Sequence, residues 1–301
     1  MEGLIGFGAL LVLLFLRVQV RIAFAIVGIV GLYLLVGIRA TSSSVLTTLW
    51  STSTSYTLMT IPLFTLMGQL AGSSSIGAGL YSAGTKWFGR LPGGMAIGTT
   101  WGSAFLGAVT GQSQTGVTTF LPIAYKPMLD LGYDKKIALG SIVAGGTIGA
   151  MIPPSTSFII YGIITDTSIG QLFMAGVGPG ILEAILYSLA IYLLTASGFW
   201  PGPRGQHYSL GEKLRGLKDI WGMLVLFVGV IGGIYIGWFT PTEAGAVGAF
   251  GAFILLVIDR GFDWPVIKVA LWETVLITCM VFVIIVGALI FMRFLAVAGL
   301  S

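Results

Sequence analysis

The chain has 301 residues, of which 56% are hydrophobic and only 9% are charged, and its mean hydropathy is +0.99. A charged fraction this small cannot cover the surface of a soluble domain. The composition therefore predicts an all-α polytopic membrane protein. The net charge of +4 is scattered between apolar runs, which argues against a nucleic-acid partner. One cysteine and one histidine exclude a disulfide framework and a His/Cys metal cluster.

Apolar runs separated by polar or Pro/Gly-rich breaks predict the helices. They lie at about 3–16, 22–38, 56–72, 94–125, 137–165, 171–195, 220–238, 244–258 and 266–298. The first run resembles the core of a signal peptide, but no small-residue cleavage site follows it, and Arg17 and Arg21 lie on the wrong side of it. A first transmembrane helix is therefore the favoured interpretation.

The run from Leu91 to Lys126 is about 36 residues long, enough for one and a half spans. Its centre is polar and rich in helix-breaking residues: Thr110, Gly111, Gln112, Ser113, Gln114, Thr115 and Gly116. This pattern predicts a re-entrant hairpin whose tip lies at membrane depth.

The run 137–165 is interrupted by Ile152, Pro153, Pro154 and Ser155. Two consecutive prolines remove two backbone donors and force the preceding residue out of the helical conformation. A broken helix is predicted at this point.

Positive charges orient the chain, because cytoplasmic loops carry an excess of Lys and Arg. We take the Arg17/Arg21 turn as cytoplasmic, 91–126 as a hairpin and 73–90 as a surface helix on the same face. Only Arg39 then lies outside, and the N-terminus is periplasmic. Thirteen basic residues lie inside: Arg17, Arg21, Lys86, Arg90, Lys126, Lys135, Lys136, Arg204, Lys213, Arg215, Lys218, Arg260 and Lys268.

The order of the spans predicts an inverted repeat, a hallmark of secondary transporters. Three spans precede the hairpin, the broken helix and a return span. Three further spans follow the basic loop 200–219, and they cross the membrane in the opposite directions to the first three. The second repeat is incomplete at Ser301. The expectation is that the chain is a fragment or that another chain supplies the rest.

A hairpin tip and an unwound helix at mid-membrane leave carbonyl oxygens free, which predicts a Na⁺ site, while the new helix N-termini suit an anionic substrate. The alternative is that Ser, Thr and Gly only pack helices together. Candidate oxygens belong to Gln112, Ser113, Gln114 and Thr115 at the tip and to Ser155, Thr156 and Ser157 after the prolines, with Gly111, Gly116 and Gly149 allowing close approach. Among them, the Na⁺ candidates are Ser113, Thr115, Ser155 and Thr156.

Charged residues inside the runs are few. Glu183 lies deepest in its span, where a functional carboxylate and a helix contact both remain open. Thr240-Pro241-Thr242-Glu243 predicts a helix cap. Asp166 is expected to end a span, and the role of Arg293 stays open.

Several ordered segments together resemble the large membrane subunit of TRAP (tripartite ATP-independent periplasmic) transporters, the DctM-like family. The resemblance covers nearly the whole chain. It is carried by Ile61-Pro62-Leu63-Phe64-Thr65-Leu66-Met67-Gly68, Phe105-Leu106-Gly107-Ala108-Val109-Thr110-Gly111-Gln112-Ser113, Leu121-Pro122, Met128, Gly132-Tyr133, Ile152-Pro153-Pro154-Ser155, Tyr161-Gly162, Gly178-Pro179-Gly180 and Phe239-Thr240-Pro241-Thr242-Glu243-Ala244.

The resemblance implies an elevator-type, Na⁺-coupled importer in the bacterial inner membrane. Its implied partners are a small four-helix membrane subunit and a periplasmic binding protein for carboxylates such as C4-dicarboxylates or sialic acid. One Na⁺ site would map onto Gly111 to Thr115 and Ile152 to Ser157. The tip departs from the family's usual Ser-Gly-Ser, and the family continues to a second hairpin and a second broken helix.

The predicted division has five parts. Residues 1–72 and 220–301 form a scaffold, 73–90 an amphipathic arm, 91–199 the elevator and 200–219 a cytoplasmic loop. No enzymatic activity and no cofactor besides coupling Na⁺ are expected. Two alternatives are a permease driven by a separate ATPase, since the chain has no phosphate-binding loop of its own, and an intramembrane hydrolase using Ser113.

Overall fold

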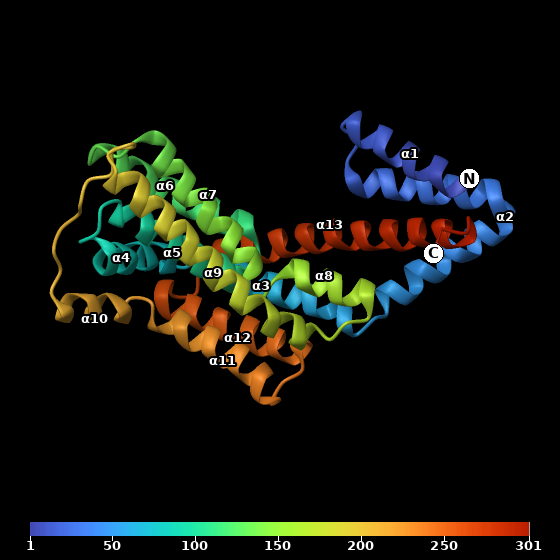
Figure 1. Ribbon diagram of the computed structural model, residues 1–301. Coiled ribbons are helices and arrows are strands. Elements are labelled where there is room, and N and C mark those ends of the chain that lie inside the picture. The colour runs from blue at the N-terminus through green and yellow to red at the C-terminus, as the bar shows by residue number, and fades with distance from the viewer. Residues whose placement is uncertain (301) are drawn as a thin grey trace. The chain divides into compact units, whose positions relative to one another are not determined.

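The computed structural model describes residues 1–300, and every regular element in that range is a helix (Figure 1). The elements are α1 (Glu2–Phe15), α2 (Val20–Ser53), the 3₁₀ turn η1 (Thr57–Met59), α3 (Thr60–Gly72), α4 (Ile76–Phe88), α5 (Gly94–Thr110), α6 (Ser113–Asp130), α7 (Lys135–Met151), α8 (Thr156–Thr165), α9 (Ile169–Ala196), α10 (Leu210–Lys218), α11 (Trp221–Ile236), α12 (Pro241–Arg260) and α13 (Trp264–Val297).

Five segments are long and apolar enough to cross a membrane, and a sixth results if α10 and α11, which are bent by 66° to each other, form one span. The five are Val20–Ser53, Lys135–Thr165, Ile169–Ala196, Pro241–Arg260 and Trp264–Val297. These helices confirm the predicted all-α polytopic membrane class. The inverted repeat and the elevator stay predictions.

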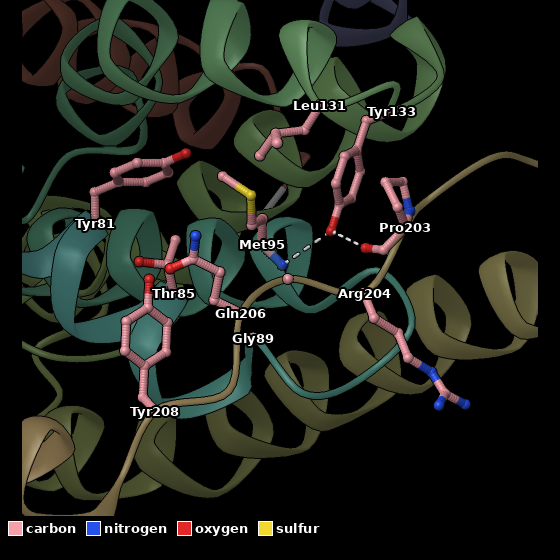
Figure 2. Close-up of a pocket in the computed structure, with 11 residues that line it drawn as sticks. Tyr81, Thr85, Gly89, Met95, Leu131, Tyr133, Pro203, Arg204, Gln206 and Tyr208 are labelled. Atoms are coloured by element: carbon pink, nitrogen blue, oxygen red, sulfur yellow. Dashed lines mark hydrogen bonds between the residues drawn. The ribbon is translucent and has the colours of Figure 1, made fainter.

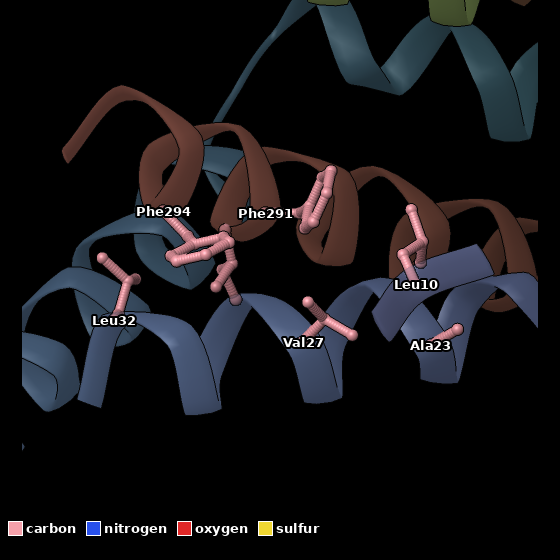
Figure 3. Packing of buried hydrophobic residues seen from close by; sticks show 7 residues of the cluster. Leu10, Ala23, Val27, Leu32, Phe291 and Phe294 are labelled. Atoms are coloured by element: carbon pink, nitrogen blue, oxygen red, sulfur yellow. The ribbon is translucent and has the colours of Figure 1, made fainter. Parts of the chain in front are cut away.

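The chain divides into two compact units, Met1–Met59 with Val275–Ser301 and Thr60–Thr274. In the first unit, α1 and α2 pack with the end of α13 around Leu10, Val27 and Phe294 (Figure 3). A Cβ atom added at Gly28 would lie 2.8 Å from the backbone nitrogen of Phe291, so α2 and α13 are in backbone contact at this point.

Helix α2 continues beyond the predicted run 22–38 to Ser53, with a kink at Gly37, whose φ of 78° is left-handed. The added part is rich in Ser and Thr, which usually favour turns. Here their hydroxyls donate to carbonyls one turn earlier, as Thr41 does to Gly37 at 2.9 Å and Thr47 to Ser43 at 2.8 Å.

In the second unit, α5 packs against α4 and α7, α6 packs against α7, and α3 packs against α12. The α3–α12 contact includes a 2.7 Å hydrogen bond between the buried hydroxyls of Thr60 and Thr242. The predicted arm 73–90 contains α4. The predicted loop 200–219 contains α10, which begins with a capping box formed by Ser209 and Glu212.

Asp259, near the end of α12, binds the N-terminus of α4. Its two carboxylate oxygens accept from the backbone N–H of Ser75 at 2.7 Å and from the Ser75 hydroxyl at 2.6 Å. Asp259→Ala should therefore lower the free energy of unfolding by about 1 kcal/mol, as the loss of a helix cap does. Thermal unfolding of the purified chain measures this, with Asp130→Ala as the control, which should not destabilise. Equal losses in the two variants would contradict the capping role.

Candidate functional site

The predicted hairpin is an antiparallel pair of helices, α5 and α6, joined by two residues. Gly111 ends α5 with a left-handed φ of 67°, which a side chain would disfavour, and Gln112 is extended, with φ −137° and ψ 125°. A Cβ on Gly111 would lie 2.9 Å from the carbonyl oxygen of Pro154, so glycine is also needed for space.

The predicted broken helix is α7 followed by α8. Helix α7 ends at Met151, and Ile152 and Ser155 are both extended, each with ψ 126°. Pro153 and Pro154 lie between them and are buried. Re-entry of the hairpin into a membrane stays a prediction.

The hairpin tip and the helix break contact each other directly. The backbone N–H of Thr156, the first residue of α8, donates to the carbonyl oxygen of Gly111 at 3.2 Å. We call this contact, with residues 110–115 and 151–156, the junction. Four helix ends meet there: α5 and α7 bring carbonyl groups, while α6 and α8 bring free N–H groups.

The predicted site residues differ in how deeply they are buried at the junction. Gly111, Pro153, Pro154 and Ser155 are buried, and Ile152, Gln112, Ser113, Thr115 and Thr156 are partly buried. Gln114 and Ser157 are exposed. The structure therefore does not bring these last two side chains into the protected part of the site.

Ser155 has an unsatisfied hydroxyl. Its side chain is 0% exposed, and its Oγ has no hydrogen-bond partner among the residues described. Gln112 Nε2 is buried and also has no partner. Because buried polar atoms are normally paired, an unpartnered hydroxyl at the junction marks a place where another species can bind.

Thr65 in α3 is a further candidate that the sequence analysis did not identify. Its side chain is 0% exposed and its Oγ1 has no partner within residues 1–300. Gly68, one turn later on α3, is so close to α5 that an added Cβ would lie 2.6 Å from the Cα of Thr110. A threonine inside the apolar run 56–72 was the available signal, but nothing in the sequence showed that α3 comes this close to α5.

Close backbone contacts hold the junction together. A Cβ on Gly149 of α7 would lie 2.5 Å from the Cα of Gly107 of α5, and one on Gly146 would lie 2.8 Å from the carbonyl oxygen of Ser113. The three helices α5, α6 and α7 thus pack through glycine, as membrane helices commonly do.

Neutral oxygens are the groups at the junction that can hold a cation. No group of three or more His, Cys, Asp or Glu side chains that could hold a metal ion occurs within residues 1–300. Hydroxyl and carbonyl oxygens suit hard, weakly bound cations rather than transition metals. This ligand chemistry fits the Na⁺ that the sequence predicts at Ser113, Thr115, Ser155 and Thr156.

The base of the hairpin lies beside a cavity of about 380 Å³ (Figure 2). The Tyr133 hydroxyl donates to the carbonyl oxygen of Pro203 at 2.8 Å and accepts from the Met95 N–H at 3.2 Å. Burial raises the pKa of Tyr133 and raises the pKa of Tyr81 to about 12. Arg204 also lines this cavity, and its side chain points away from Tyr81 and Tyr133 (Figure 2).

The segment 200–208 links the start of α5 to the segment after α6. Gly93 N–H donates to the carbonyl oxygen of Gly202 at 2.9 Å, and Asp134 N–H donates to that of Pro201, also at 2.9 Å. Both ends of the hairpin therefore lie together at its base.

The charged residues noted in the sequence have separate places. Glu243 caps α12: its Oε2 accepts from Thr240 N–H at 2.8 Å, which confirms the structural interpretation. Asp166 ends α8 with a left-handed φ of 51°. Glu183 lies in α9 and contacts Thr147 of α7, and Arg293 lies in α13.

Apolar helices that pack through glycine around a broken-helix junction define a multi-pass membrane protein. The family described as tripartite ATP-independent periplasmic transporter, DctM component, matches residues 7–301. The chain belongs to this family of TRAP transporter large permeases, which are transporters and not enzymes.

Characterised relatives differ in the solute that they are named for. A C4-dicarboxylate TRAP transporter large permease of Pseudomonas aeruginosa is 35% identical over 81% of this chain and 57% of its own length. An ectoine TRAP transporter large permease of Halomonas elongata is 32% identical over 91% of this chain and 64% of its own length. A sialic acid TRAP transporter large permease of Vibrio cholerae is 30% identical over 78% of this chain and 55% of its own length. The chain thus spans between 55% and 64% of the length of these relatives.

Proposed function

We propose that the chain is part of the large permease of a Na⁺-coupled importer of a small carboxylate, and that the junction holds a coupling Na⁺. The observation that carries the proposal is the Ser155 hydroxyl, which is fully buried beside the Gly111–Thr156 contact and has no partner in the part of the chain that the structure describes. A Na⁺ ion would satisfy this oxygen together with carbonyl groups at the ends of α5 and α7.

The substrate class follows from the other two helix ends. The N-termini of α6 and α8 present free N–H groups and the positive end of the helix dipole, which favour an anionic group. Two of the relatives are named for C4-dicarboxylates and sialic acid. The transporter would receive its substrate from a periplasmic binding protein and would assemble with a small membrane subunit, as the family resemblance implies.

Uptake by the complete transporter in proteoliposomes tests the proposal. With labelled succinate or sialic acid supplied on the binding protein, replacing external Na⁺ by choline should reduce the initial rate at least about tenfold, which corresponds to about 1.4 kcal/mol. Vanadate, an inhibitor of many transport ATPases, should have no effect. Uptake that is insensitive to choline replacement, or that vanadate stops, would show a different energy source.

A further inference from the structure

The cavity at the base of the hairpin has no part in the proposed function. It lies between four segments that are distant in the sequence: α4, the start of α5, the residues after α6 and the segment 200–208. Met95 lines it, while Thr110 belongs to the junction, and these two residues of α5 are about 23 Å apart along the helix. The volume of about 380 Å³ is in the range of small-molecule sites, roughly 300–1,000 Å³.

The hydroxyl of Tyr81 lacks a partner at this cavity. Tyr81 is one of the lining residues, and its Oη is buried and makes no hydrogen bond within residues 1–300. Buried hydroxyls are normally paired, and leaving one unpaired costs about 1–3 kcal/mol. The missing partner is therefore expected to come from a molecule in the cavity.

Two other hydroxyls on the cavity wall have already given away their protons. Tyr133 donates to the carbonyl oxygen of Pro203 at 2.8 Å, and Thr85 donates to that of Ser82 at 2.9 Å. A hydroxyl has one proton, so the Thr85 oxygen faces a ligand as an acceptor only. The wall thus offers a donor at Tyr81 and an acceptor one turn later on α4.

The segment 200–208 adds further neutral groups. The amide of Gln206 and the hydroxyl of Tyr208 point toward the same region of the cavity as the Tyr81 hydroxyl (Figure 2). An amide both donates and accepts hydrogen bonds. Met95 and Leu131 contribute apolar surface to the same wall.

Charged groups are directed away from the interior of the cavity. Arg204 is the one charged residue among the described residues that line it, and its side chain is exposed and points away from Tyr81 and Tyr133 (Figure 2). The Met95 N–H, at the start of α5, already donates to Tyr133 Oη at 3.2 Å, so an anion at this helix end would have to displace the tyrosine. Burial and the neighbouring Tyr133 and Tyr208 raise the pKa of Tyr81 to about 12, so its hydroxyl keeps its proton at neutral pH.

We propose that this cavity binds an uncharged ligand with several hydroxyl groups, such as a polyol or a monosaccharide. Each hydroxyl of such a ligand both donates and accepts. One can accept from Tyr81 while others donate to the Thr85 oxygen and to the carbonyl oxygen of the Gln206 amide. The C–H groups of the ligand fit the apolar wall. A free molecule and the sugar headgroup of a glycolipid both supply this chemistry.

Saturation-transfer NMR on the purified chain in phosphatidylcholine nanodiscs tests the proposal, because this lipid has no hydroxyl in its headgroup. The probes are glycerol, myo-inositol and glucose. We expect saturation transfer to at least one of them, with an affinity at least about threefold weaker in Tyr81→Phe, which keeps the ring and loses one hydrogen bond. Tyr192→Phe is the matched control, because Tyr192 lies on α9 outside the cavity and is 38% exposed, and it should bind as the wild type does.

Two exposed residues of the segment 200–208 distinguish an uncharged ligand from an anion without disturbing the core. Gln206→Leu should weaken binding of the probe, whereas Arg204→Gln should leave it unchanged. Glycerol 3-phosphate should bind no more tightly than glycerol. Loss of binding in Arg204→Gln, or tighter binding of the phosphate, would overturn the proposal and identify an anion site.

Two further results would also overturn the proposal. Saturation transfer to none of the probes, or equal affinity in the wild type and Tyr81→Phe, would show that the cavity holds only water. Adding a monoglucosyl diacylglycerol to the nanodiscs then identifies the source: displacement of the probe supports a glycolipid headgroup, and no displacement supports a free molecule. Neither Na⁺ nor uptake enters these measurements, so their failure would leave the proposed function standing.

Discussion

Ser155→Ala is expected to raise the Na⁺ concentration that uptake requires while leaving the fold intact. The variant deletes a buried oxygen that faces the proposed ion, and losing such a contact to a charged group costs about 1.5–3 kcal/mol, or about 10- to 100-fold in ion affinity. The change is measured as the Na⁺ concentration needed for half-maximal uptake.

Ser157→Ala is the matched control, because Ser157 lies two residues after Ser155, in the first turn of α8, and is exposed. It should transport as the wild type does. Thermal unfolding separates binding from folding: without Na⁺, Ser155→Ala should be as stable as the wild type or more stable, because an unpaired buried hydroxyl is removed. The proposed role of Ser155 is wrong if Na⁺ stabilises both variants equally.

Gly149→Val is expected to prevent stable packing of α7 on α5. The new Cβ would meet the backbone of Gly107 at 2.5 Å, and backbone cannot rotate away as a side chain can. We expect a loss of about 3 kcal/mol or more in the free energy of unfolding, the upper range for overpacking. Thermal unfolding in detergent and the yield of folded chain both report this loss.

Gly140→Ala provides the comparison within the same helix. No atom lies within 4 Å of a Cβ added at Gly140, so alanine should stabilise α7 by about 0.5–1 kcal/mol. If the two substitutions changed the unfolding temperature alike, the close contact between α5 and α7 would not be the source of stability.

Local chemistry made the breaks in the helices predictable. Gly111 with its polar neighbours and the Pro153–Pro154 pair interrupt helices through their own backbone properties, whatever surrounds them. The cap at Thr240 and Glu243 was predictable for the same reason. Such features depend on one residue, on adjacent residues or on residues within one turn of each other in the sequence.

Contacts between distant segments were not predictable from one sequence. Nothing local indicates that the Gly111 carbonyl meets the Thr156 N–H or that Gly68 lies against Thr110, since both depend on how α3, α5 and α8 cross. The extension of α2 to Ser53 was missed because Ser and Thr occur in loops as readily as in helices. In this segment their hydroxyls bond to carbonyl oxygens one turn earlier, which the sequence alone does not reveal. The division into a moving elevator, residues 91–199, and a fixed scaffold, residues 1–72 and 220–301, stays a prediction.

The two ends of the hairpin are held in different ways. At the base, Gly93 and Asp134 bind the 200–208 segment through backbone groups, and Gly93 has a φ of +69° and leaves no room for a side chain, since an added Cβ would lie 2.8 Å from the Thr195 hydroxyl. At the tip, fit depends on the side chains and glycines of the junction. If the junction holds the coupling ion as we propose, substitutions of its side chains change the ion preference while the backbone hydrogen bonds at the base keep the hairpin in place.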